Sequence, residues 1–189
     1  STLMGLRGIR VPETWVIPWM DSPGETPAPC QDQQTFCDLL AAHLDDDAVY
    51  AVRSSSNIED ARFHSFAGLF NTHLNVRGCP AIAEAVCDVW RETHSERVIH
   101  YLERLDLSAE DIRMAVIVQE MVEPVISGVF FSQNPMTGTS EMVIECVPGE
   151  GTALVGEGVT PERWVGRREG WVAKPEEGQL PLEIACRIR

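Results

Sequence analysis

The sequence predicts an α+β fold, in which short helices alternate with antiparallel strands. Residues 114–122 form a nearly continuous apolar run, which is typical of a buried strand. Residues 48–52 form a second, shorter apolar run of the same kind. Between these two runs, apolar residues recur at helical spacing across residues 80–105. Helices and strands therefore alternate along the chain, and the sequence contains no internal repeats.

Ahead of the first apolar run, the chain predicts an edge strand, a loop and a helix. Residues 9–20 have the composition of a strand, and Pro12 and Pro18 restrict this segment to a sheet edge or a connection. Residues 21–29 are rich in Pro, Gly, Ser and Thr, which predicts a loop. Residues 32–43 carry apolar side chains on one face, which predicts a surface helix.

In the second half of the chain, strands follow the long helix. Pro80 is well placed in the first turn of that helix. We expect residues 114–122 and residues 125–132 to form a hairpin, because a Glu-Pro turn separates the two strands. Residues 142–147 predict another strand, and residues 163–172 predict a short hairpin.

Length and charge limit the classes of partner. The chain has 189 residues, which suits one domain or two small ones, and its formal net charge is −14. An acidic protein repels nucleic acid and anionic membranes, so we expect neither as a partner. The sequence has neither an apolar run long enough for a membrane span nor a signal peptide. We therefore expect a cytoplasmic protein, and a nucleotide remains a suitable ligand because it needs only a local positive patch.

The cysteines give no sign of a metal site. No pair has C-x-x-C spacing and no histidine cluster accompanies them, which argues against zinc. We expect reduced thiols, most of them buried, and a disulfide framework is the alternative. The six cysteines are Cys30, Cys37, Cys79, Cys87, Cys146 and Cys186.

Arg53 is the first candidate for a functional side chain. The apolar run at residues 48–52 leads directly into Arg53, and we expect the three serines that follow to form a turn. A Ser-Phe-Ala-Gly segment comes next at residues 65–68. Backbone N–H groups, hydroxyls and a guanidinium would converge there on negative charge, which predicts an anion-binding loop. The alternative is an ordinary β-turn-β unit with a solvated arginine.

Four motifs occur in order and cover most of the chain. They are AVRSSSNIEDARFHSFAGLFNTHLNV at residues 51–76, VQEMV at 118–122, SGVFFSQNPMTG at 127–138 and IECVPGEGTALVGEGVTPE at 144–162. They resemble the signatures of the ATP-binding domain shared by phosphoenolpyruvate synthase, pyruvate phosphate dikinase and rifampin phosphotransferase. Four ordered matches are far more specific than any single motif.

The resemblance implies an ATP-grasp-like fold with mixed, largely antiparallel sheets and flanking helices. ATP would lie between two α+β subdomains, which we expect at residues 1–112 and 113–189, the second of them incomplete. Arg53 would bind the ATP phosphates and serve catalysis. The residues on the loop that covers the nucleotide would be Gly68, Leu69 and Thr72. The strand that meets the adenine would comprise Gln119, Glu120, Met121 and Val122.

Two positions in these motifs keep alternative explanations. Gln119 would also suit the polar position of an edge strand that binds no ligand. Glu145, in the fourth motif, would suit a nucleotide site, but equally a solvated or ion-paired strand end.

The chain also departs from the family pattern. The family's phosphate-binding lysine aligns just before Ser1, and Lys174, the only lysine, lies in a polar tail. Thr152 stands where the family has a glutamate, and Leu69 replaces a common glutamine. The D-I-E-W and Q-x-R-P motifs, which supply the metal-binding glutamate and further phosphate contacts, align beyond Arg189. We therefore expect Mg²⁺ ligands outside this chain, and little or no turnover by the isolated chain.

The resemblance implies that the chain is the ATP-binding portion of a longer ATP-dependent phosphotransferase, a kinase or dikinase. Phosphate from ATP would pass through a histidine on another domain to a small acceptor. The expected partners are ATP with Mg²⁺, the phosphohistidine domain and the acceptor-binding domain. The alternative is a non-catalytic nucleotide-binding or regulatory module that keeps the fold, which the short length and Thr152 favour. The acceptor is not encoded in these residues.

Overall fold

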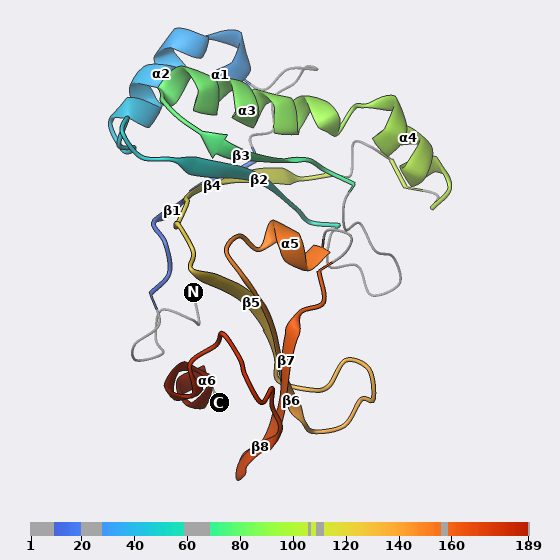
Figure 1. The fold of residues 1–189 in the computed structure, drawn as a ribbon. Helices are drawn as coiled ribbons and strands as arrows, with labels where there is room; N and C mark the ends of the chain where they lie inside the picture. Colours follow the sequence, from blue (N-terminus) through green and yellow to red (C-terminus); the bar gives the residue numbers. More distant parts are fainter. Residues whose placement is uncertain are drawn as a thin grey trace. The chain divides into compact units, whose positions relative to one another are not determined.

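The computed structural model describes residues 10–19, 28–58, 69–105, 107–108, 112–155 and 159–188. The chain divides into two compact units, Ser1–Met121 and Val122–Arg189. Each unit contains one four-stranded antiparallel sheet with helices, so the α+β prediction is confirmed (Figure 1). The expected boundary after residue 112 differs from this division, because the strand that begins at Met114 completes the first sheet.

The first sheet has the strand order β1-β4-β2-β3, and every neighbouring pair is antiparallel. The expected hairpin between residues 114–122 and 125–132 is wrong. Strand β4 pairs with β1 on one side and with β2 on the other, so both of its edges are occupied. The bounds are β1 Thr14–Ile17, β2 Tyr50–Ser56, β3 Thr72–Val76 and β4 Met114–Glu120.

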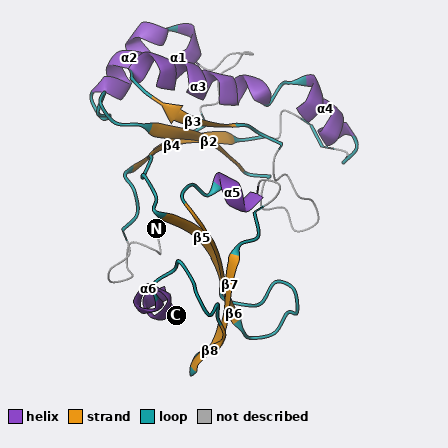
Figure 2. Cartoon of the chain, viewed as in Figure 1, coloured by secondary structure: helices purple, strands orange, loops and turns teal. Residues whose placement is uncertain are grey.

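Helices of the first unit lie over one face of this sheet (Figure 2). The single helix expected over residues 80–105 is two helices, because the Thr93 hydroxyl donates to the Trp90 carbonyl and Ser95 caps a new helix at the Val98 N–H. Pro80 lies in the first turn of α3, as predicted. The bounds are α1 Ala28–Gln31, α2 Gln33–Ala41, α3 Cys79–Glu92 and α4 Glu96–Glu103.

The core of the first unit forms between the sheet and these helices. Val52 of β2 and Val118 of β4 are cross-strand partners, and both are fully buried. Trp90 of α3 packs in the same cluster, and its Nε1 donates to the Met114 carbonyl at 2.9 Å. Burying a valine side chain stabilises a fold by roughly 1.5 to 3 kcal/mol, so this face of the sheet is fixed toward the helices.

A disulfide joins Cys30 of α1 to Cys87 of α3, with 5.7 Å between the two Cα atoms. The expectation that all six cysteines are reduced is therefore wrong for this pair. The partners are 57 residues apart in sequence, and their contact depends on how α1 packs against α3, which no sequence spacing encodes. The other four cysteines, Cys37, Cys79, Cys146 and Cys186, are free thiols.

The second unit is built on a meander with the strand order β5-β6-β7-β8. The hairpin predicted for residues 163–172 is confirmed as the β7–β8 pair. The rings of Trp164 and Trp171 meet edge to face, with 5.4 Å between their centroids. Ala185 of the last helix is fully buried in the same hydrophobic cluster. The bounds are β5 Ile126–Phe131, β6 Met142–Pro148, β7 Glu162–Arg167, β8 Gly170–Ala173, α5 Thr152–Val155 and α6 Leu182–Ile188.

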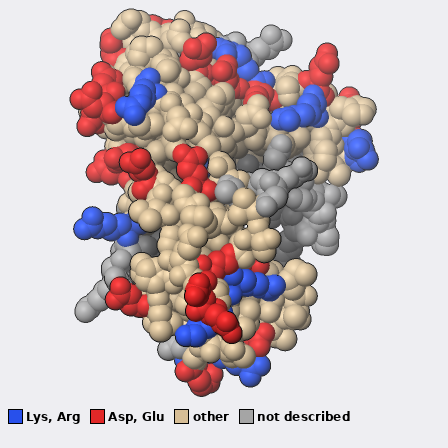
Figure 3. Space-filling view, viewed as in Figure 1, with Lys and Arg blue, Asp and Glu red and all other residues tan. Residues whose placement is uncertain are grey.

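Within the described residues, no helix is both long and apolar enough to cross a membrane. The drawn face of the molecule carries acidic side chains on both units, with basic side chains set singly among them (Figure 3).

Candidate functional site

The face of the first sheet that the described helices leave uncovered carries Arg53. Side chains alternate between the two faces of a strand, and directly opposed residues of antiparallel strands share a face. Arg53 of β2 opposes Ile117 of β4 and Thr72 of β3. Since Val52 faces the helices, these three side chains lie on the opposite, uncovered face.

Arg53 is exposed and has no side-chain hydrogen bond or ion pair to any other described residue. Its guanidinium can therefore meet an external anion with all of its donors. The serine turn expected after it is wrong. Strand β2 continues to Ser56, because Ser54, Ser55 and Ser56 each find a pairing partner on the long strand β4.

The predicted loop residues have different environments. Thr72 is exposed at the start of β3, directly opposite Arg53. The Leu69 side chain is buried in the core, and its carbonyl accepts a hydrogen bond from the Arg97 guanidinium. Gly68 lies outside the described residues.

Two charged helix residues hold the segment between Leu69 and Thr72, and no sequence motif indicated either of them. Arg97 of α4 contacts the Leu69 carbonyl, and Glu92 of α3 accepts from the Asn71 backbone N–H at 2.8 Å. These contacts join residues 21 and 28 positions apart, so no local pattern reveals them. The start of β3, and with it Thr72, is fixed from the helix side.

Gln119 lies on the same uncovered face, two residues beyond Ile117 on β4. Its Nε2 donates to the Thr14 Oγ1 at 2.9 Å across the β1–β4 pair. Strand β4 is a central strand of the sheet, which removes the alternative of an edge-strand polar position. Arg53, Thr72 and Gln119 are thus brought to one face by three different strands.

The end of the predicted adenine strand has two backbone N–H groups that are used within the first unit, followed by one that donates to no described residue. The Glu120 N–H donates to the Glu13 carbonyl at 2.9 Å, and the Met121 N–H donates to the Val49 carbonyl at 2.7 Å. Among the hydrogen bonds between described residues, none uses the Val122 N–H, and the Val122 side chain is 62% exposed.

A bulge in β3 holds Met121 in place. The β2–β3 register shifts between Tyr50 and Val52, and Asn75 has a φ of 60°. Asparagine tolerates this left-handed conformation better than most residues, so its position at the end of the first motif was the available signal. The Asn75 N–H contacts the Met121 Sδ at 3.1 Å, which links the bulge to the end of β4.

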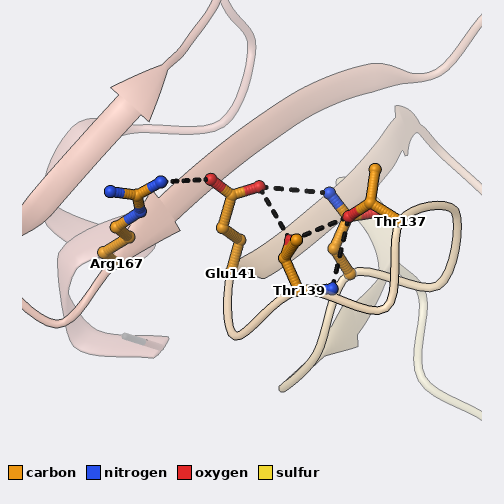
Figure 4. A network of polar contacts seen from close by, with 5 residues as sticks. Thr137, Thr139, Glu141 and Arg167 are labelled. Atoms are coloured by element: carbon orange, nitrogen blue, oxygen red, sulfur yellow. Dashed lines mark hydrogen bonds and ion pairs between the residues drawn. The ribbon is translucent and has the colours of Figure 1, made fainter.

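In the second unit, Glu141 organises the loop between β5 and β6 (Figure 4). Its carboxylate accepts from Arg167 at 3.0 Å and from the Thr139 hydroxyl at 3.2 Å. It also accepts from the buried Asn134 amide at 3.4 Å. Hydrogen bonds from Arg167, Asn134 and Thr139 lower the pKa of Glu141 below its ordinary value. No sequence motif singled out Glu141 or Arg167.

Glu145 forms an ion pair with Arg163, with 3.5 Å between Oε1 and Nε. The two residues are cross-strand partners on β6 and β7. This geometry fits the ion-paired alternative for Glu145.

Neither of two surface hollows coincides with the predicted residues. A cavity of about 100 Å³ in the second unit includes Glu162, whose carboxylate is already used by Trp164 and by the N–H groups of Gln179 and Leu180. A groove of about 670 Å³ lies beside α2 and α3, and its lining residues are Gln33, Gln34, Cys37, Pro80, Ala81 and Glu84. The chemistry of a phosphate ligand favours the Arg53 face, because neither lining contains a basic side chain.

Mg²⁺ prefers carboxylate and other oxygen ligands held together in one place. The part of the chain that the structure describes brings no three His, Cys, Asp or Glu side chains into such a group. The described residues therefore offer no cluster of three such ligands that would hold Mg²⁺ without its nucleotide.

Comparison with known proteins identifies a family. The model of the pyruvate phosphate dikinase AMP/ATP-binding domain matches residues 32–182. Phosphoenolpyruvate synthase from Aeropyrum pernix is 42% identical over 116 residues, which cover 61% of this chain and 14% of that protein. Rifampicin phosphotransferase from a Streptomyces species is 37% identical over 140 residues, 74% of this chain and 16% of that protein.

A third relative is named for another compound, prodigiosin. The prodigiosin synthesizing transferase of Serratia marcescens is 38% identical over 133 residues, which cover 68% of this chain and 15% of that protein. The chain thus spans about one seventh of the length of the relatives it matches.

Proposed function

The chain belongs to the family of the pyruvate phosphate dikinase AMP/ATP-binding domain, and we propose that it binds ATP on the uncovered face of its first sheet. One observation carries the proposal. Arg53 is exposed, has no partner among the described residues, and shares that face with Thr72 and Gln119. All three residues lie inside the matched range of the family.

The phosphates would be bound by Arg53 and Thr72. A guanidinium presents five N–H donors in a fixed fork that suits phosphate oxygens, and charge-assisted hydrogen bonds are about twice as strong as neutral ones. The Thr72 hydroxyl, directly opposite on β3, supplies a further donor. We propose that the backbone at Gly68 and Leu69 covers the phosphates.

The adenine would be bound by the end of β4. An adenine edge needs an acceptor for its 6-amino group and a donor for N1. The Glu120 carbonyl and the Val122 N–H could supply these from one extended backbone, on either side of Met121. Support for this assignment comes from the Val122 N–H, which no described group uses, and from the fixed position of Met121.

We propose that the chain works within a longer, cytoplasmic ATP-grasp-like phosphotransferase, whose subdomains correspond to the two units. Phosphate from ATP would reach a small acceptor through a histidine on another domain. Mg²⁺, held by residues outside this chain, would neutralise charge on the phosphates, and Arg53 would orient them. The relatives are named for phosphoenolpyruvate, rifampicin and prodigiosin, so the family context does not point to one acceptor class.

A non-catalytic nucleotide-binding module is the second candidate. Thr152, the first residue of α5, is uncharged at the position where the family pattern has a glutamate. A chain that binds ATP but never transfers phosphate, even when joined to its flanking sequence, would favour this candidate.

Titration of the chain with ATP and Mg²⁺ by calorimetry tests the binding site. We expect Arg53→Ala to raise the Kd about tenfold or more, because it removes a charged donor worth about 1.5 to 3 kcal/mol. Arg91→Ala is the matched control, since Arg91 is an exposed arginine on α3 whose ion pair with Asp88 lies on the helix side. Equal affinity of the Arg53 variant and the unaltered chain would contradict the assignment.

A further inference from the structure

We propose that Thr14 is a positioning residue that locks the Gln119 carboxamide, so that the site selects a purine with an amino group at C6. This inference rests on the proposed binding of ATP at the uncovered face. Thr14 lies outside the residues that the family model matches and outside every motif in the sequence.

A short hydrogen-bond chain determines which way the carboxamide is turned. The Thr14 hydroxyl lies 2.8 Å from the Pro12 carbonyl, which can only accept, so the single hydroxyl hydrogen is committed there. The Thr14 Oγ1 can then only accept from Gln119, at 2.9 Å. An amide oxygen in that place would have to take the hydroxyl hydrogen away from the Pro12 carbonyl, so only an Nε2 that points to Thr14 keeps both hydrogen bonds.

The same chain leaves the Gln119 Oε1 free. No hydrogen bond between described residues uses this oxygen. The cross-strand neighbours of Gln119 are Thr14 on β1 and Ala51 on β2, and Ala51 offers only a methyl group. The side chain is half-buried at the end of β4, beside the backbone proposed to meet the base. Gln119 thus presents a fixed acceptor to a ligand on this face.

A fixed acceptor distinguishes two kinds of purine. The 6-amino group of adenine donates a hydrogen to it, whereas the 6-oxo group of hypoxanthine brings a second acceptor against it. Without the Thr14 hydroxyl, the carboxamide can turn over and present its Nε2 to the 6-oxo group. Loss of the hydroxyl should therefore weaken discrimination rather than abolish binding.

The test compares the Kd for ATP and for inosine triphosphate, each with Mg²⁺, by calorimetry on the full chain. We expect the unaltered chain to prefer ATP about tenfold or more, the usual cost of an unmatched polar pair. Thr14→Val, which keeps the shape and the β-branched side chain, should reduce this preference severalfold, and Thr14→Ser should restore it. Thr35→Val is the matched control, because the Thr35 hydroxyl bonds Asp32 on the helix side of the unit.

Each outcome separates the inference from the function on which it rests. An unchanged ATP preference in Thr14→Val, with ATP still bound, overturns the role of Thr14 and leaves the proposed function intact. An equal weakening of both nucleotides reduces Thr14 to a structural residue and also overturns the inference. Failure of the unaltered chain to bind either nucleotide overturns the proposed function itself.

Discussion

At the scale of single residues, Arg53 in the first unit and Glu141 in the second differ in how their charges are paired. The Arg53 guanidinium has no partner among the described residues, so it is available to an anionic ligand. Glu141 is a charge whose two oxygens are both used within the protein, by Arg167 on one side and by Asn134 and Thr139 on the other. The first arrangement is suited to binding and the second to holding a loop.

Glu141 should make the stability of the second unit depend on pH. Its pKa is lower in the folded protein, so its contribution is fully present above the ordinary glutamate pKa of about 4.3 and is lost as the pH falls through the folded value. We expect Glu141→Gln to lower the midpoint of urea unfolding at pH 7, and the difference from the unaltered chain to shrink on acidification below about pH 4.

Glu169→Gln is the control for this pH series, because Glu169 lies exposed in the β7–β8 turn. If the difference in urea midpoint between Glu141→Gln and the unaltered chain stays constant from pH 7 to pH 3, the shape of the side chain, rather than its charge, accounts for the lost stability.

The contacts of individual residues were the least predictable from sequence. Arg53, Thr72 and Gln119 were predicted as site residues because they stand in motifs. Thr14 and Gln119 contact each other across 105 residues, and Thr14 sits in a segment whose prolines suggested only an edge or a connection. A cross-strand contact depends on the register between two strands, and the residue pattern of one strand does not specify that register.

At the scale of elements, the strands were predicted better than their pairing. The apolar runs at 48–52 and 114–122 became β2 and β4, because continuous apolar segments suit a central buried strand. The hairpin expected after β4 failed because adjacency in sequence was taken as adjacency in space. Strand β4 instead pairs with β2, from a segment about 60 residues earlier, and bridges β1 and β2.

The Cys30–Cys87 disulfide ties α1 to α3 and should stabilise the first unit. The chain-entropy model gives about 4 kcal/mol for a loop of this size, and measured losses are typically about 2 to 5 kcal/mol. We therefore expect the Cys30→Ser/Cys87→Ser double variant to lower the free energy of unfolding by several kcal/mol. Burial raises the pKa of the free Cys79 thiol at the start of α3 to about 11, so this thiol stays protonated near neutral pH and is a poor nucleophile for thiol–disulfide exchange.

Cys186→Ser is the control for the disulfide, because Cys186 is an exposed free thiol on α6 in the other unit. Unfolding is followed by denaturant titration, and the covalent link is checked from the intact mass with and without reductant. A double variant as stable as the unaltered oxidised chain would contradict the account.

At the scale of the whole molecule, the chain is two sheet units, and the residues predicted for ATP come mainly from the first. Arg53, Thr72 and Gln119 share one face of that unit's sheet, opposite the helices that bury Val52 and Val118. The family could be predicted from sequence because its four motifs occur in order. The division into units could not, since it depends on which sheet receives β4.

The central claim is that ATP binds the uncovered face of the first sheet. The most direct test is a titration of the ¹⁵N-labelled chain with ATP and Mg²⁺, followed by backbone amide chemical shifts. We predict saturable shifts centred on Arg53, Thr72 and residues 119–122, with α2 and the middle of α3 unperturbed. Shifts centred instead on the α2–α3 groove around Gln34 and Glu84, or no saturable shifts at all, would contradict it.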